Sequence, residues 1–326
     1  MLRSTKYQRL AYKLGLSLRS VNPMGPPAAA PTWYGTDSKG FSVGGTSGPV
    51  TTADKATFSS ETTSAQTSAN LSGPRAQGAS GGNNTIAYCI GGYDTTGNPQ
   101  TSANKLTHSN DTMASNASAA LPAARSGIMA AVYSSAIYSY GGSNPGGSLN
   151  KVEAYKTPYS NDTTAALTSA NLSTGRDSGM TVSSDSAAIY LGGFTSGFVG
   201  RTLVDKMPFS TETSANNASL VLPAAKAYGN FGSINGPIST KGFLAASSAL
   251  TTWAKVTYAT DTSSTVSTNS VEQSSGMSSS ATGYTLGGSS GGQVATAYKF
   301  PFSSETASTI SAMNKTVSKA QSMGFC

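Results

Sequence analysis

The chain has 326 residues, of which only 11% are charged and 36 are glycine, and its formal net charge is +7. The low fraction of charged residues and the regular spacing of apolar residues exclude a disordered chain. Two cysteines and one histidine exclude a disulfide framework and a Cys/His metal cluster. No apolar run is long enough to predict a membrane-spanning helix.

Residues 1–33 predict a basic N-terminal arm. They hold five basic residues and no acidic one, giving +5, whereas the other 16 basic and 14 acidic residues leave only +2. The nearly neutral remainder does not predict nucleic-acid binding. Apolar residues of the arm fall at helical spacing, and prolines at positions 23, 26, 27 and 31 predict an extended linker.

Three roles fit such an arm: a mitochondrial-type targeting peptide, a segment that lies on a membrane or nucleic acid, and a docking arm. It has no apolar core of a secretory signal. We expect docking to other proteins of a larger assembly, because free basic arms normally fray and an ordered one is held by a partner. The expected contact residues are Arg3, Lys6, Tyr7, Arg9, Leu10, Lys13, Leu14 and Arg19.

From residue 34 onward the chain repeats, with six copies of about 49 residues each, (326 − 33)/6. In five copies a glycine pair ends an apolar stretch, and the degenerate fifth copy has Ala245–Ala246 instead. Alternating apolar and small residues before the pair predict a strand packed on one face, which ends where glycine lets the backbone turn. The pairs are Gly44–Gly45, Gly91–Gly92, Gly141–Gly142, Gly192–Gly193 and Gly287–Gly288.

A second pattern recurs in all six copies: a lysine, three residues later an aromatic residue or His108, and three residues later an acidic residue followed by threonine. The lysines are Lys55, Lys105, Lys156, Lys206, Lys255 and Lys299. The acidic residues are Glu61, Asp111, Asp162, Glu212, Asp261 and Glu305.

Two interpretations of these twelve residues compete. They could form a ring of binding sites, or each lysine and acid could position a turn or pair locally because every copy meets the same packing problem. We favour the structural interpretation, because a site for a single ligand breaks the symmetry of a repeat. An exposed pair of this kind adds only about 0–1 kcal/mol.

The repeats predict an all-β fold, a single six-bladed β-propeller of four-stranded antiparallel blades over residues 34–326, with five or seven blades as the less favoured numbers. Residues 319–325 match the first strand of a copy and then stop. Residues 37–45 supply the strand that should follow. We therefore expect one blade to be built from both ends of the chain, which closes the ring and removes exposed sheet edges.

Residues 34–326 resemble the kelch family of β-propellers in their glycine pairs after an apolar strand and in their period of about 50 residues. The tryptophan and tyrosine that usually follow the glycine pair are missing, and Lys-x-x-aromatic stands there instead. Divergent repeats with threonine-rich turns of this type also resemble structural proteins of bacteriophage particles, including tail and fibre components.

Little in the sequence predicts chemistry. A Ser-His-Asp triad has only His108 as its base, and this histidine occupies an aromatic position of the repeat. A carboxylate pair of a glycosidase, brought together from different blades, stays open. We expect no enzyme activity, no metal and no cofactor.

The loops after the glycine pairs differ among the copies, as contact loops often do. Their candidate contact aromatics are Tyr93, Phe194 and Phe198. Ordinary loop variation explains them at least as well.

The leading hypothesis for function is a non-enzymatic structural protein of a virus particle, with a phage as the favoured case. The propeller would be a rigid module of the virion, present in several copies and attached to tail or capsid through the arm. One alternative is an adhesin of the particle that binds a host-surface glycan. Another is a cellular propeller scaffold or glycan-active enzyme.

Overall fold

The computed structural model describes residues 38–46, 50–144, 150–196, 199–223, 225, 234–235, 240–244, 253–266, 273–289, 292–313 and 321–322. The predicted arm and its eight contact residues lie outside these ranges. Within them, no helix is long and apolar enough to cross a membrane.

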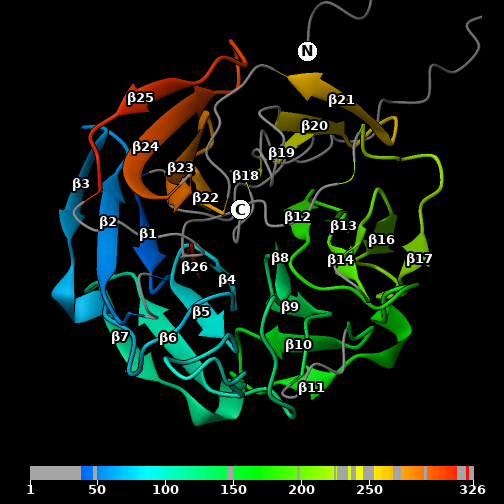
Figure 1. The fold of residues 1–326 in the computed structure, drawn as a ribbon, viewed down its shortest axis with the longest axis horizontal. Coiled ribbons are helices and arrows are strands. Elements are labelled where there is room, and N and C mark those ends of the chain that lie inside the picture. The colour runs from blue at the N-terminus through cyan, green and yellow to red at the C-terminus, as the bar shows by residue number, and fades with distance from the viewer. Residues whose placement is uncertain are drawn as a thin grey trace, which may run out of the picture. The chain divides into compact units, whose positions relative to one another are not determined.

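Six antiparallel sheets of four strands stand around a ring, so the described chain is a six-bladed β-propeller (Figure 1). The first strand of each blade lies nearest the centre of the ring and the fourth lies at its rim. This confirms the predicted fold class, blade number and blade size.

The blades follow one another in chain order. Blade 1 consists of β26 (Gln321–Ser322), β1 (Lys39–Val43), β2 (Ala53–Thr57) and β3 (Thr62–Ala65). Blade 2 consists of β4 (Ala79–Gly82), β5 (Ile86–Ile90), β6 (Ala103–Thr107) and β7 (Thr112–Ser115). Blade 3 consists of β8 (Met129–Tyr133), β9 (Ala136–Tyr140), β10 (Ala154–Pro158) and β11 (Ala165–Ala166).

Blade 4 consists of β12 (Met180–Ser183), β13 (Ala187–Leu191), β16 (Val204–Pro208) and β17 (Ala215–Asn216). Blade 5 consists of β18 (Ile234–Asn235), β19 (Lys241–Leu244), β20 (Trp253–Thr257) and β21 (Thr262–Val266). Blade 6 consists of β22 (Ser275–Ser278), β23 (Thr282–Ser289), β24 (Gln293–Pro301) and β25 (Ser308–Ile310).

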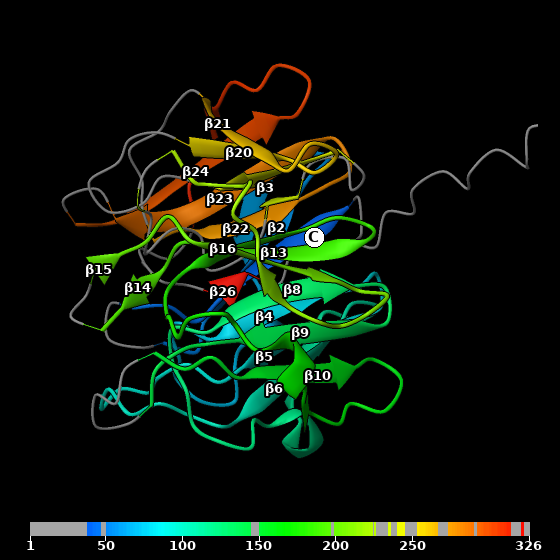
Figure 2. The same cartoon turned by 90° about the vertical axis from the view of Figure 1, so that its right-hand side faces the viewer.

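Short additional elements connect the strands. Single 3₁₀ turns follow the fourth strands of the first three blades, namely η1 (Thr67–Ala69), η2 (Ala117–Ala119) and η4 (Thr168–Ala170). Blade 4 carries an extra hairpin of β14 (Phe194–Thr195) and β15 (Val199–Gly200) in the loop after its glycine pair. In the side view of Figure 2 this hairpin lies at the left edge of the propeller.

In blades 1 to 4 the glycine pair directly follows the second strand, where the chain passes close to the segment that enters the next blade. In blade 6 the predicted strand end is wrong, because β23 continues through Gly287 and Gly288 to Ser289 with a register shift at the pair. Gly91 and Gly92 have φ of +64° and +96°, and the Gly92 N–H donates to the Arg125 carbonyl at 2.8 Å. A Cβ on Gly91 would lie 2.4 Å from Ile128 Cδ1, so both the backbone angle and the contact require glycine. The degenerate pair of the fifth copy lies outside the described residues.

The second strands are buried on both faces, not on one as the alternation predicted. Cys89 and Tyr190, at the position expected to be polar, are 0% exposed, and Ser139 is 1% exposed. Each blade packs between two neighbours, so a strand near the centre of the ring has no solvent face.

Six clusters of buried apolar side chains form the core of the described chain, one between each pair of neighbouring blades. Typical members are, from the boundary of blades 1 and 2 onward, Phe41 with Leu106, Tyr88 with Ile137, Tyr138 with Met207, Ile189 with Val256, Phe243 with Phe302, and Tyr284 with Phe58. Burying one such side chain contributes about 1.5–3 kcal/mol. These clusters therefore supply more of the stability than surface ion pairs at the same boundaries.

The two ends of the propeller close the ring in one sheet. β26 pairs antiparallel with β1, with Val43 opposite Gln321 and Ser42 opposite Ser322. This confirms the prediction that the C-terminal strand completes the first blade. The inner edge of β1 is thereby paired, as in other closed β architectures.

Candidate functional site

The repeated lysines and acids form ion pairs between neighbouring blades. Each lysine lies on the third strand of one blade, and its partner lies in the turn before the fourth strand of the next blade. The pairs and their N–O distances are Lys55–Asp111 3.1 Å, Lys105–Asp162 2.6 Å, Lys156–Glu212 2.5 Å, Lys206–Asp261 2.8 Å, Lys255–Glu305 2.8 Å and Lys299–Glu61 2.7 Å. The last pair joins blade 6 to blade 1 and closes the ring. We expected local partners, whereas each lysine reaches into the following copy.

A strained turn points each acid towards the preceding blade. All six acids have positive φ, between 48° and 57°, which is uncommon for residues other than glycine. In blade 2 the Asn110 side chain steadies this turn, since its Oδ1 accepts from the Thr112 hydroxyl at 2.7 Å and from the Thr112 N–H at 3.3 Å. This explains why a threonine always follows the acid.

At four of the six boundaries the acid receives a second donor from the preceding blade. The Tyr138 hydroxyl donates to Glu212 at 2.7 Å, and the Tyr88 hydroxyl donates to Asp162. Blades 1 and 5 have Phe41 and Phe243 in place of this tyrosine. There a second lysine, two residues earlier, donates to the acid instead of the tyrosine hydroxyl. Lys39 contacts Asp111, and Lys241 lies 2.6 Å from Glu305.

Sequence reasoning missed this substitution. Its signal is the triplet Lys-Gly-Phe, which stands at this strand position in the first and fifth copies, at residues 39–41 and 241–243.

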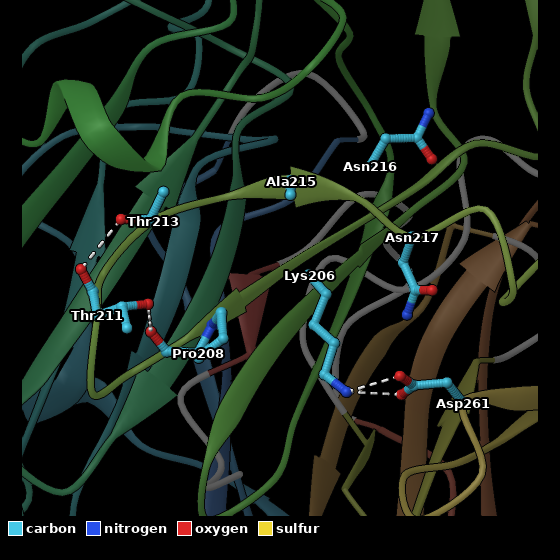
Figure 3. Close-up of a pocket in the computed structure, with 8 residues that line it drawn as sticks. All are labelled: Lys206, Pro208, Thr211, Thr213, Ala215, Asn216, Asn217 and Asp261. Carbon is cyan, nitrogen blue, oxygen red and sulfur yellow. Dashed lines mark hydrogen bonds and ion pairs between the residues drawn. The ribbon is translucent and has the colours of Figure 1, made fainter.

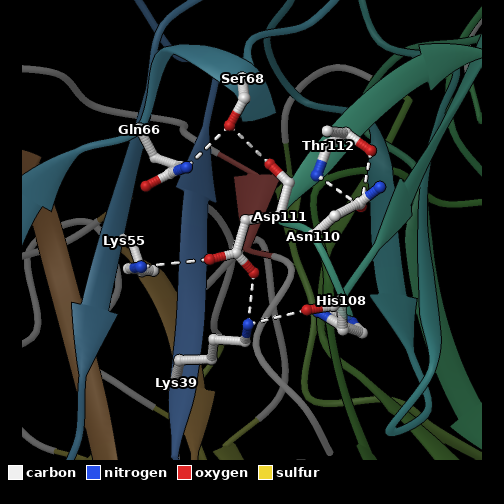
Figure 4. Close-up of polar contacts among 8 residues, drawn as sticks. All are labelled: Lys39, Lys55, Gln66, Ser68, His108, Asn110, Asp111 and Thr112. Atoms are coloured by element: carbon white, nitrogen blue, oxygen red, sulfur yellow. Dashed lines mark hydrogen bonds and ion pairs between the residues drawn. The ribbon is translucent and has the colours of Figure 1, made fainter.

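The boundary between blades 1 and 2 shows the full set of contacts (Figure 4). Asp111 lies between Lys39 and Lys55, and Ser68 of blade 1 donates its hydroxyl to the Asp111 carbonyl at 2.8 Å. Burial alone would raise the pKa of Asp111, but the hydrogen bonds and charges of the two lysines outweigh it and lower the pKa. The carboxylate is thus held ionised between two cations.

The aromatic residue of the repeat stacks on the preceding blade. Ring centroids lie 4.7 Å apart for Phe58 and Tyr284, and 5.4 Å apart for Phe302 and Phe243. His108 occupies the same position against Phe41 at 6.0 Å and is 4% exposed. Burial, with a smaller effect of Lys39, lowers the pKa of His108 to about 4. The histidine is a neutral core residue at neutral pH.

Arginines at the entrance to the blades are buried as well. Arg176 and Asp205 of blade 4 form an ion pair at 2.6 Å in which both side chains are 0% exposed. Arg125 binds Glu153 and Tyr155 in blade 3 at 3.2 and 3.0 Å. These cations are part of the blade interior and are not available to a partner.

The candidate contact aromatics lie in separate loops. Tyr93 of blade 2 is half-buried, and its backbone bonds to Ala76 at 2.9 and 3.1 Å. Phe194 of blade 4 is half-buried in β14, and its backbone bonds to Asp177 in the same way. Phe198 lies outside the described residues. Their role as contact residues stays a prediction.

A groove of about 330 Å³ with polar and apolar lining lies along the outer strands of blade 4 and ends at blade 5 (Figure 3). Its base is the pair of Lys206 and Asp261, in which the ammonium lies 2.8 Å from each carboxylate oxygen. Its lining residues are Lys206, Pro208, Thr211, Thr213, Ala215, Asn216, Asn217 and Asp261. No sequence motif marks this groove.

Within the described ranges, no group of three or more His, Cys, Asp or Glu side chains is arranged to hold a metal ion. In comparisons with protein-family models and with curated proteins, nothing matches the chain. The resemblances to kelch propellers and to phage structural proteins therefore stay predictions from the sequence.

Proposed function

We propose that this chain is a non-enzymatic structural protein of a virus particle, with a bacteriophage as the favoured case. The propeller is a rigid module of kelch-like type, and the basic arm of residues 1–33 attaches it to other proteins of the tail or capsid. Several copies would be present in each particle.

The closed ring of blade-to-blade contacts is the observation that carries this proposal. Every boundary between blades has an apolar cluster and a Lys–acid pair. Within blade 1, strands from the two ends of the propeller share one sheet. Such a body holds its shape while its arm or its loops engage neighbours, which suits a building block of a particle.

The use of the acidic residues also supports a non-enzymatic role. At least eight of the 14 acidic residues are in ion pairs with lysine or arginine: the six of the repeat, Glu153 and Asp205. A glycosidase needs two carboxyl groups that face a substrate. Few carboxyl groups outside these ion pairs are left to serve a glycan-active enzyme, so this alternative is less favoured.

Mass spectrometry and immunoblotting of purified particles of the encoding virus test the proposal. The full-length chain should co-purify with particles. A variant with glutamine in place of Arg3, Lys6, Arg9, Lys13 and Arg19 should fold equally well and be lost from them.

A control variant keeps the arm intact and replaces two cations of the propeller, Lys151→Gln with Arg201→Gln. This variant should still be incorporated. If the wild-type chain never co-purifies with particles, the virion proposal is wrong. If the arm variant is incorporated like the control, attachment through the arm is wrong.

A further inference from the structure

The boundary between blades 4 and 5 departs from the repeat at two positions. Ile189 stands where blades 2 and 3 have the tyrosine that donates to the acid, so Lys206 is the hydrogen-bond donor found on the Asp261 carboxylate. The second position is that of Asn217. In blade 2 its equivalent, Asn116, donates from Nδ2 to Asp162 at 3.1 Å, and in blade 3 Leu167 packs on the apolar core.

Asn217 makes neither contact. Its Oδ1 accepts from the Ser219 hydroxyl at 3.0 Å, while its enclosed Nδ2 has no hydrogen-bond partner. In Figure 3 this amide points towards the Lys206–Asp261 pair. The position thus serves packing at one boundary and a hydrogen bond at another, and here the Asn217 side chain lines a groove.

The lining suits an uncharged ligand with many hydroxyl groups. Lys206 and Asp261 neutralise each other at the base, so neither an anion nor a cation gains a net charge partner. The Thr211 and Thr213 hydroxyls donate to backbone carbonyls and keep their lone pairs as acceptors for such a ligand.

Two small apolar surfaces complete the groove. Pro208 and Ala215 lie among the polar groups, where they can contact the C–H face of a sugar ring. The volume of about 330 Å³ is at the low end of known ligand sites, which run from about 300 to 1,000 Å³. The groove therefore has room for one or two sugar rings.

We propose that the groove between blades 4 and 5 is a binding site for a neutral saccharide. The site differs from the loops after the glycine pairs and does not depend on the role in the particle. A surface glycan or a free oligosaccharide presents the same chemistry to it.

The first experiment is a glycan array of neutral and anionic oligosaccharides probed with the full-length chain, followed by calorimetric titration of the strongest neutral binder. The test variant is Asn216→Ala with Asn217→Leu, which gives blade 4 the Ala166–Leu167 sequence of blade 3. The apolar leucine in place of the Asn217 amide changes the wall of the groove and should weaken binding about tenfold or more.

The matched control is Gln66→Leu, the same kind of change at the equivalent position of blade 1, which should leave the affinity within about twofold. Thr213→Val serves as a second test variant if the double variant unfolds, and it should weaken the same binding.

Three results would overturn the proposal: no glycan on the array binds, the test variants bind as well as the control, or only anionic glycans bind. Capture of peptides at this groove in place of sugars would overturn it too. A particle-incorporation failure would leave these results unaffected, so the two proposals fail separately.

Discussion

His108 should make the propeller sensitive to mild acid, and replacing it should remove most of that sensitivity. The imidazole is buried against the Phe41 ring of blade 1, and burial, with a smaller effect of Lys39, lowers its pKa from 6.5 to about 4. The other five copies have phenylalanine or tyrosine at this position. His108→Phe therefore restores the residue type that the boundary accepts elsewhere.

The direction of the effect follows from proton binding. Between the unfolded pKa of 6.5 and the folded pKa of about 4, the unfolded chain holds the proton and the folded chain does not, so stability falls as pH falls. The loss is about 2 kcal/mol between about pH 7 and about pH 5, and about 3 kcal/mol once the pH is below about 4.

Asp177 acts in the opposite sense. Burial raises its pKa to about 6, so its contribution to stability is lost as pH rises through this range. Wild type and His108→Phe both carry Asp177, so the difference between their pH dependences reports the effect of His108 alone.

The assay is urea unfolding of the wild type and of His108→Phe at about pH 7 and about pH 5. The wild type should lose about 2 kcal/mol more than the variant over this interval. His108→Asn, which cannot titrate, should flatten the dependence in the same way, whatever its packing costs at neutral pH. If wild type and both variants lose the same stability, His108 is not held neutral by burial and the reasoning fails.

Three further predictions concern the contacts that hold the ring. Arg176→Met removes one partner of a fully buried pair and should cost about 3–5 kcal/mol in urea unfolding, whereas Lys299→Met at a part-exposed pair should cost about 1 kcal/mol or less; similar costs would show that burial does not set the difference. Gly141→Ala places a Cβ 2.3 Å from a backbone oxygen at φ +63° and should lower the free energy of unfolding by about 1–3 kcal/mol or more. Gly73→Ala, with open space around it, should be nearly neutral. Equal melting temperatures of the two variants would contradict this. Removing residues 321–326 deletes β26 and should lower the melting temperature by several degrees, which calorimetry measures; an unchanged value would mean that the closing strand adds no stability.

The sequence predicted the architecture well because each copy repeats the same strand-ending and turn-forming residues. The glycine pairs located the ends of the second strands in blades 1 to 4, although not in blade 6, where β23 continues to Ser289. The incomplete C-terminal copy predicted how β26 completes blade 1. The burial of both faces was missed, since alternation of small and large residues such as Ser139 beside Tyr138 looks like one exposed face. Only the neighbouring blade shows that both sides are covered.

The direction of the ion pairs could not be read from the repeat. Within one copy the lysine precedes its acid by six residues, as Lys105 precedes Asp111, whereas its actual partner Asp162 is 57 residues away. Every copy supplies both residues, so a perfect repeat is equally consistent with pairing inside a copy and between copies. The groove was missed because its lining residues form no sequence motif that distinguishes blade 4 from the other copies.

The head-to-tail arrangement of the Lys–acid pairs gives each blade one face that carries the lysine and one face that carries the acid. In an oligomer, interfaces of this kind close into rings when the rotation per unit allows and otherwise continue into open chains. Here the same logic acts within one polypeptide, with Lys299 as the last donor and Glu61 as the first acceptor. A molecule that fails to close presents these two faces to another copy, and the matching face of that copy is chemically identical to its own. We therefore expect misassembly to take the form of exchange of terminal blades between molecules, which requires both the Lys299–Glu61 pair and the β26–β1 pairing to open.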